Sequence, residues 1–201
     1  MYLGVDSGKR SGATIGMCAD PRKGLQILRC EGVDLDTRDL ELVVEHAVDL
    51  AEQYSLPLIA MLETWGRGGP LGLDQWIGLG EARGPWRREL RIRCKDTDAL
   101  TLKRILLASQ SRWRSLVVTE TGGEVDGEWV AFDPPGWKLA AKRAAEAHFV
   151  DAYVPPDDAA ESACIVVYAS RSDAAAEALG ARYLAKRGVV YEPLERRIFA
   201  R

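Results

Sequence analysis

The sequence predicts a mixed α/β domain, with three antiparallel strands first, parallel strands after them, and helices on both faces of the sheet. Three short apolar runs at the start, "YLGVD", "ATIGMC" and "LQILRC", are separated by turn-forming residues. Beyond them, amphipathic helical stretches alternate with further apolar runs. The chain has 201 residues, of which 47% are hydrophobic and 28% charged, so we expect a single domain over residues 1–201.

Periodicity predicts the elements that follow. From residue 37 to residue 51, apolar residues recur at the spacing of a helix with one buried face. The run "PLIAMLE" is typical of a strand buried on both faces, and it ends at Glu63. A helix follows in "DQWIGLGEARG", and Pro85 predicts a break or kink with a second helical piece after it, because an internal proline costs about 3 kcal/mol.

The second half of the chain predicts more helices and one hairpin. We expect an amphipathic helix in "DALTLKRILLASQSRW", with Leu102, Ile105 and Leu106 facing inward. "SLVVTE" and "EWVAF" predict two strands, with a tight turn at Asp126 and Gly127. Two more helices are expected after the paired prolines in "DPPGWKLAAKRAAEAHFV" and "VPPDDAAESACIVVYASR".

Composition narrows the functional classes. No stretch approaches the roughly 18 apolar residues of a membrane span, and no signal peptide pattern is present, so we expect a cytoplasmic protein. The four cysteines form no C-x-x-C pair, so neither a zinc site nor a disulfide framework is predicted.

The charge is unevenly distributed. Residues 83–114 contain ten lysines and arginines and three acids, which gives this stretch a charge of +7 in a chain of net charge −3. Phosphate binding depends on local charge, so the stretch is a candidate nucleic-acid surface. An ordinary solvated helical face is the alternative interpretation.

Four acids stand at the predicted ends of elements. Asp6 ends the first strand and Glu63 the fourth, so they emerge side by side if these strands are parallel neighbours. Asp158 and Glu161 lie three residues apart, on one face of the first turn of a helix. Each acid taken alone also suits a structural role, because acids in a first helical turn are favoured by the helix dipole.

The four acids together predict a metal site. Two carboxylates about 4 Å apart repel by about 4 kcal/mol at an effective dielectric of about 20. Four of them would offset much of the free energy of unfolding of a domain, which is only about 5 to 15 kcal/mol. Oxygen ligands without histidine or cysteine select Mg²⁺ or Mn²⁺, and such ions support phosphodiester cleavage.

Five motifs resemble those of the RuvC-type Holliday-junction resolvases, in the ribonuclease H-like superfamily, and in particular their phage and bacterial branch. "LGVDSGKRSGATIGM" resembles the first strand and turn, "AMLETW" the second motif, and "LGEARG" the small-residue helix after it. "FDPPGWKLAAKRAA" is similar to the family's Pro-x-x-Trp-Lys stretch, and "DDAAESACIVVYA" to its final acidic helix. The motifs span most of the chain in the family's order.

The resemblance implies a ribonuclease H-like fold and a Mg²⁺-dependent endonuclease, also served by Mn²⁺, that resolves four-way DNA junctions as a homodimer. The family's catalytic, metal-binding acids correspond to Asp6, Glu63, Asp158 and Glu161. Glu161 replaces the more usual aspartate, which leaves open whether Asp157 or Asp158 is its partner.

The resemblance also suggests where DNA binds. Trp65, on a glycine-rich loop, either stacks on a base, worth about 1 to 3 kcal/mol, or packs on the domain edge. Lysines of the family near the scissile phosphate suggest a role for Lys138 and Lys142, although a solvated face would also carry them. The basic section at about 85–127 is longer than expected for the family, as if inserted to widen the DNA surface. The candidate DNA contacts are Trp65, Arg67, Arg83, Arg87, Arg88, Lys138 and Lys142.

Three other functions stay open at this point. Sugar kinases and actin-like ATPases also begin with an aspartate and glycines after a first strand, but they need two such domains. A non-catalytic module could bind branched DNA through the basic section, and it would not need the four acids. The ribonuclease H-like core also serves nucleases that cut RNA:DNA hybrids or flaps.

Overall fold

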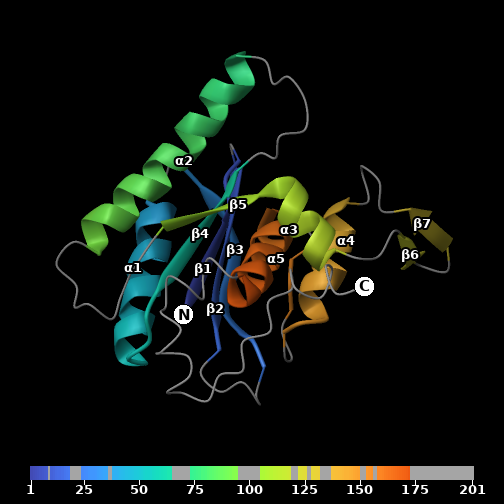
Figure 1. Ribbon diagram of the computed structural model, residues 1–201, viewed down its shortest axis with the longest axis horizontal. Coiled ribbons are helices and arrows are strands. Elements are labelled where there is room, and N and C mark those ends of the chain that lie inside the picture. Colours follow the sequence, from blue (N-terminus) through green and yellow to red (C-terminus); the bar gives the residue numbers. More distant parts are fainter. Residues whose placement is uncertain are drawn as a thin grey trace.

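A five-stranded mixed sheet forms the centre of the computed structural model (Figure 1), which describes residues 1–8, 10–18, 24–35, 38–64, 73–94, 105–118, 122–125, 128–131, 137–149, 153–155 and 158–172. The strand order is β3-β2-β1-β4-β5. The strands are β1 (Tyr2–Asp6), β2 (Arg10–Met17), β3 (Gln26–Asp34), β4 (Ile59–Thr64) and β5 (Ile105–Ser109). β1, β2 and β3 are antiparallel, whereas β1, β4 and β5 are parallel, so the predicted mixed sheet is confirmed.

Helices cover both faces of this sheet, as predicted (Figure 1). One face packs against α1 (Asp39–Gln53) and α2 (Leu73–Arg93). The other packs against α3 (Gln110–Val117), α4 (Trp137–Glu146) and α5 (Asp158–Arg171). Within the ranges given above, none of the helices has the length and apolarity needed to cross a membrane.

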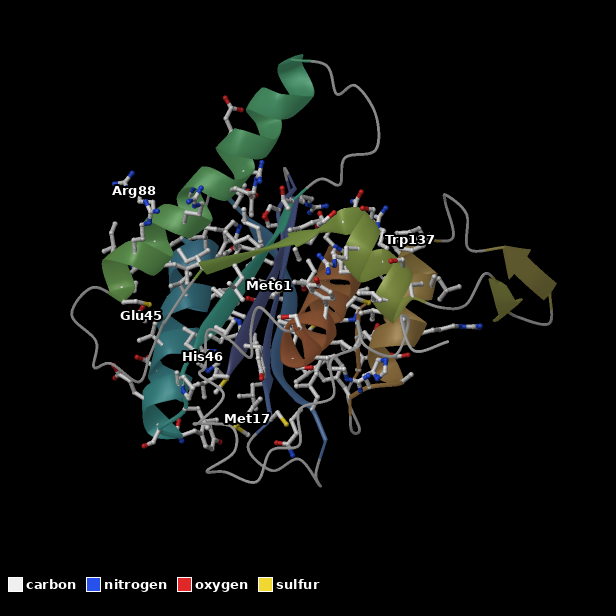
Figure 2. The ribbon with its side chains drawn as sticks, in the orientation of Figure 1. Met17, Glu45, His46, Met61, Arg88 and Trp137 are labelled. Carbon is white, nitrogen blue, oxygen red and sulfur yellow. The ribbon has the colours of Figure 1, made fainter. Side chains whose placement is uncertain are left out.

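The alternation of side chains along the strands divides the core into two layers. Along β4, Ile59 and Met61 face the layer of α5, whereas Ala60 and Leu62 face the layer of α1 (Figure 2). The predicted stripe on α1 is buried against that second layer: Leu40, Val43, Val44, Ala47, Val48 and Ala51.

Glycines let α5 lie directly on β1 and β2. A Cβ at Gly4 would lie 2.5 Å from the carbonyl oxygen of Ser162, and a Cβ at Gly12 would overlap the carbonyl oxygen of Asp158. Every residue of α5 from Ala159 to Ala169 is buried. The close approach brings the first turn of α5 to the edge of the sheet where β1 ends.

The structure corrects the helix predicted in "DALTLKRILLASQSRW". Within it, Ile105–Ser109 form β5, which pairs with β4, and the helix α3 begins only at Gln110. Ile105 packs against the α1 layer and Leu106 lies in the α5 layer, which is the alternation of a strand. Tertiary pairing with β4 overrides the apparent helical periodicity. Leu102 lies outside the described residues.

The predicted hairpin is confirmed, but its first strand is displaced. The strands are β6 (Gly122–Val125) and β7 (Glu128–Ala131), and the pairing of Val125 with Glu128 leaves a two-residue connection. The expected strand "SLVVTE" is wrong at its start, because residues 115–117 form the last turn of α3. Leu116 and Val117, which lie in this turn, are buried in the core.

Of the break or kink predicted at Pro85, the break is wrong and the kink stays a prediction. α2 is one helix from Leu73 to Arg93 with Pro85 inside it. Proline removes the hydrogen bond to the carbonyl of Glu81, and both residues lie on the exposed side of the helix, where water can satisfy that carbonyl. The buried side, with Trp86 and Leu90, continues across the proline.

Candidate metal centre

The sheet register places Asp6 beside Glu63. Val5 of β1 pairs with Leu62 of β4, so the next residues along these parallel strands, Asp6 and Glu63, are neighbours. Since Val5 and Leu62 both face the α1 layer, the two acids point to the opposite face, toward α5. Asp6 is 7% and Glu63 5% exposed, so their carboxyl groups are almost removed from water.

The first turn of α5 supplies the other two acids. Oxygen atoms of Asp6, Asp158 and Glu161 all lie within 4.8 Å of one another. Glu161 is buried and Asp158 is half-buried, and Asp158 also borders a cavity of about 280 Å³ beside Arg10 and Asp34. Of the predicted acids, the structure brings these three into one cluster, and Glu63 adjoins it through Asp6.

Burial and mutual repulsion act on the central carboxyl groups. Burial, followed by the charge of Glu63, raises the pKa of Asp6 well above its usual range. Burial also raises the pKa of Glu63. The nearby Glu161 adds to the rise in the pKa of Asp6. The negative form of Asp6 is therefore disfavoured by burial and by both neighbouring acids, and a bound cation would relieve this repulsion.

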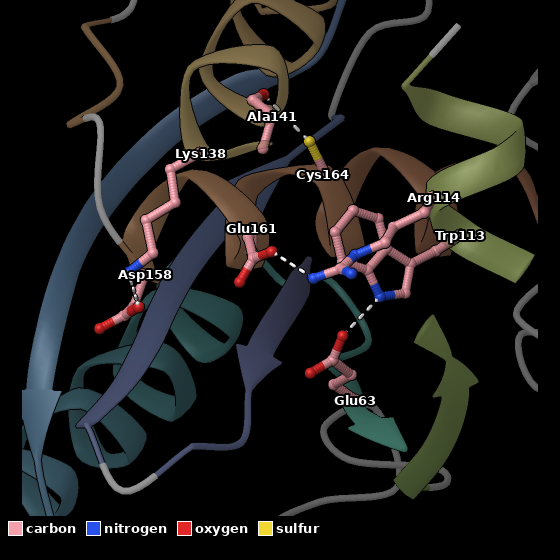
Figure 3. Close-up of polar contacts among 8 residues, drawn as sticks. All are labelled: Glu63, Trp113, Arg114, Lys138, Ala141, Asp158, Glu161 and Cys164. Atoms are coloured by element: carbon pink, nitrogen blue, oxygen red, sulfur yellow. Dashed lines mark hydrogen bonds and ion pairs between the residues drawn. The ribbon is translucent and has the colours of Figure 1, made fainter. Parts of the chain in front are cut away.

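Two basic side chains contact the cluster from opposite sides (Figure 3). The Nζ of Lys138 on α4 donates to Asp158 Oδ1, and this bond raises the pKa of Lys138. Nη2 of Arg114 on α3 donates to Glu161 Oε1 at 2.6 Å. The structure therefore places Lys138 and Arg114 beside the acids, while a contact of Lys138 with DNA stays a prediction.

The Arg114 and Trp113 contacts were missed by the sequence prediction. Nε1 of Trp113, which is fully buried, donates to Glu63 Oε1 at 3.0 Å (Figure 3). Trp113 and Arg114 are consecutive residues of α3, the segment whose strand-to-helix boundary was misplaced. Their pairing in "SRWR" was a signal, since buried tryptophan and arginine at the end of a parallel strand need polar partners.

The other predicted DNA contacts divide into two groups. Arg83 donates from Nη1 to Thr64 Oγ1 at 3.0 Å, so it lies at the end of β4 next to Glu63. Arg87 and Arg88 are exposed on α2, and Arg88 can be seen pointing outward in Figure 2. Lys142 is directed away from the acids, since its Nζ pairs with Glu146 at 2.6 Å. Two further DNA-contact candidates, Trp65 and Arg67, lie outside the described residues, as does Asp157, the alternative metal ligand to Asp158.

Part of the basic stretch is already neutralised within the chain. Arg93 forms ion pairs with Glu89 at 2.7 Å and with Glu45 at 3.4 Å. Arg114 forms an ion pair with Glu161. Among the described residues of the stretch, Arg87, Arg88 and Arg91 on α2 and Arg112 on α3 are exposed, so α2 carries most of the outward-facing positive charge described.

The cluster fits a hard divalent cation. Three carboxylates converge from β1 and α5, and among the described residues neither histidine nor cysteine belongs to this group. Such an all-oxygen donor set suits Mg²⁺, Mn²⁺ or Ca²⁺ better than Zn²⁺. Asp6, Asp158 and Glu161 could therefore hold a metal ion, while Glu63 lies beside Asp6 at the end of β4.

Comparisons with known proteins agree with this architecture. Thermus thermophilus RuvC, solved in complex with a Holliday junction substrate, is similar at a TM-score of 0.50 and 9% identity, covering 94% of this chain and 96% of that chain. This chain has the fold of RuvC. The predicted ribonuclease H-like fold class is thus confirmed, whereas membership of the phage and bacterial branch stays a prediction.

Two other solved structures show weaker similarity. A second T. thermophilus RuvC structure has a TM-score of 0.45 and 12% identity, with the same coverage of 94% and 96%. The yeast mitochondrial Holliday junction resolvase Ydc2 has a TM-score of 0.44 and 12% identity, covering 82% of this chain and 75% of that chain. No family model and no curated protein sequence matches the chain.

Proposed function

We propose that this protein is a Mg²⁺-dependent endonuclease that cuts branched DNA, with the four-way junction as its substrate. The observation that supports the proposal most is the convergence of Asp6, Asp158 and Glu161 within 4.8 Å, on a fold shared with a resolvase solved on such a junction. Mn²⁺ should replace Mg²⁺, because both accept carboxylate oxygens. A role in DNA recombination and repair would follow from this activity.

In this proposal, the acids hold the cation and the basic side chains handle the phosphate. Asp6, Asp158 and Glu161 would bind the ion, and Glu63 would orient groups beside it from β4. When bound, a divalent ion held by these acids would supply Lewis-acid chemistry for phosphodiester hydrolysis. Lys138 is 48% exposed, so its ammonium group can leave Asp158 and contact a phosphate oxygen.

The exposed arginines of α2 would bind the DNA backbone. Arg87, Arg88 and Arg91 face solvent on the helix that follows the segment after β4, and Arg83 lies between them and Glu63. Phosphate contacts of this kind position a duplex without reading its sequence. They would place a DNA arm along α2 while the scissile phosphate sits at the acids.

The direct test compares DNA substrates of one sequence. Purified protein is mixed with a labelled four-way junction, a fork, a linear duplex and an RNA:DNA hybrid, with Mg²⁺ or with a chelator. The proposal predicts metal-dependent cleavage of the junction ahead of the others. Preferential cleavage of the hybrid would instead assign a ribonuclease, and tight junction binding with no cleavage in Mg²⁺ or Mn²⁺ would assign a non-catalytic module.

We further propose that the active form is a homodimer. A four-way junction has approximate two-fold symmetry and must be cut on two like strands, which a two-fold dimer with one site per chain achieves. Light scattering at micromolar concentration, with and without junction, measures the assembly. A monomer of 22.1 kDa under both conditions that still cuts both strands would overturn the dimer.

A further inference from the structure

Arg114 is held more firmly than the other basic group at the acids. Its guanidinium carbon lies 4.5 Å from the ring centre of Trp137 and 5.4 Å from that of Trp113. Cation–π contacts of this kind restrain a guanidinium that is partly removed from water. Arg114 Nε is buried without a hydrogen-bond partner among the described residues, so the rings and Glu161 set the position of the group.

Lys138, on the opposite side of the cluster, is more exposed than Arg114 and less restrained by its neighbours. Its side chain is 48% exposed, against 29% for Arg114, and no ring contact restrains it among the described residues. A lysine on a flexible stem can withdraw when a cation arrives. Arg114 cannot withdraw without giving up contacts with both Trp113 and Trp137.

We infer that Arg114 is a fixed counter-ion of the acidic cluster. Its ion pair occupies Glu161 Oε1, and this limits how strongly divalent cations bind at the cluster. This inference rests on the proposed metal site. With one oxygen of Glu161 held by Arg114, a cation between Asp6 and Asp158 gains only the other oxygen of Glu161. The positive charge of Arg114 also repels that cation. Arg114 is thus a positioning residue that fixes Glu161 and weakens metal binding.

The consequence distinguishes a counter-ion from an ordinary structural arginine. If Arg114 only supports the fold, its removal changes stability and leaves the metal affinity of the folded protein unchanged. If it competes with the metal, its removal strengthens metal binding. Glu161 then offers both oxygens, and the repulsion is gone.

Manganese titration measures this effect without any activity assay. Free Mn²⁺ is followed by electron paramagnetic resonance as it is added to the wild-type protein, R114Q, R114K and R112Q. R114Q should bind Mn²⁺ at least about tenfold more tightly than the wild type, or bind an additional ion. R112Q removes the same charge from an exposed position of α3, and its affinity should stay within about twofold of the wild type.

The lysine variant keeps the inference testable if R114Q does not fold. A lysine side chain at this position would be a mobile charge like that of Lys138, so R114K should bind Mn²⁺ about threefold more tightly than the wild type. Added Mn²⁺ should also raise the melting temperature of R114Q more than that of the wild type, because ligand stabilisation follows affinity.

The results separate the inference from the function on which it rests. Equal or weaker Mn²⁺ binding by folded R114Q and R114K, with a wild type that binds the ion, would overturn the counter-ion role alone. If the wild type and both variants bind no Mn²⁺ at millimolar concentration, both the proposed metal site and the inference would be refuted.

Discussion

Trp113 Nε1 donates a hydrogen bond of 3.0 Å to Glu63 Oε1, which ties the helix after β5 to the carboxylate that ends β4. The indole is fully buried, so Glu63 has an ordered hydrogen-bond partner. Through this contact, a residue of α3 orients the carboxylate that adjoins the acidic cluster.

Replacing Trp113 by phenylalanine should therefore reduce cleavage. The ring is retained in part, but the hydrogen bond is lost and Glu63 is free to turn. We expect a loss of about 1 to 3 kcal/mol of stability and of roughly 10- to 100-fold in cleavage rate. Single-turnover cleavage of a four-way junction is the measurement.

A second buried tryptophan supplies the control for this variant. Trp86 Nε1 donates to Ser11 Oγ at 3.2 Å, and Trp86 packs in the α1 layer. W86F loses a similar buried hydrogen bond, so its stability should fall by a similar amount while cleavage by the folded protein is retained. Equal losses of cleavage in both variants would contradict a specific role for Trp113.

The glycine under α5 should be required for both folding and activity. A Cβ at Gly12 overlaps the carbonyl oxygen of Asp158, so G12A must displace the first turn of α5 with its two acids. We expect a destabilisation of about 1 to 3 kcal/mol and at least about tenfold slower cleavage. Gly32 pairs with Gly12 across β2 and β3, and a Cβ there meets nothing within 4 Å. Urea unfolding of G12A that matches G32A would refute this packing argument.

The exposed arginines of α2 should control DNA affinity. Reversing Arg87, Arg88 and Arg91 to glutamate removes phosphate contacts and adds repulsion. Affinity for junction and duplex should fall alike, by about 10- to 100-fold at low salt, and the dependence of affinity on salt should become shallower. Fluorescence anisotropy over a range of salt concentrations measures both. Unchanged binding would mean that the charge on α2 is only a solvated surface.

His148 should make the fold sensitive to acid. Burial, with a contribution from the nearby Arg171, lowers the pKa of His148 from 6.5 to about 4. The unfolded chain binds this proton near pH 6.5 and the folded chain only near pH 4, so stability falls as the pH drops through that window and is unaffected above it. The free energy of unfolding in urea should decline from pH 7 to pH 5 more steeply for the wild type than for H148Q. Parallel profiles would contradict the lowered pKa.

The sheet and the positions of the four acids were predictable because local pattern and tertiary structure agree there. The apolar run that ends at Glu63 has the composition of a strand buried on both faces, and the parallel pairing of β4 with β1, which the prediction assumed, is present in the structure. Asp158 and Glu161 share a helix face by their spacing alone. The convergence of these acids could thus be inferred before any coordinates.

The segment around β5 was not predictable in the same way. Ile105, Leu106 and Ala108 fit a helical stripe as well as a strand, and pairing with β4 decides between them. That error hid Trp113 and Arg114, whose roles depend on where α3 begins. The structure was also needed to show that Lys138 contacts Asp158 whereas Lys142 pairs with Glu146, since helical spacing alone places both lysines on one face.

Cleavage of a labelled four-way junction by the wild-type protein and by D6N, purified identically and assayed with Mg²⁺, tests the central proposal most directly. The account predicts that D6N cuts at least about 100-fold more slowly, with unchanged or higher thermal stability, because the amide removes one charge from buried carboxylates that repel one another. Wild-type cleavage should also stop when a chelator removes the metal. Full cleavage by D6N in Mg²⁺ would contradict the assignment of Asp6, and with it the metal centre on which the proposed nuclease depends.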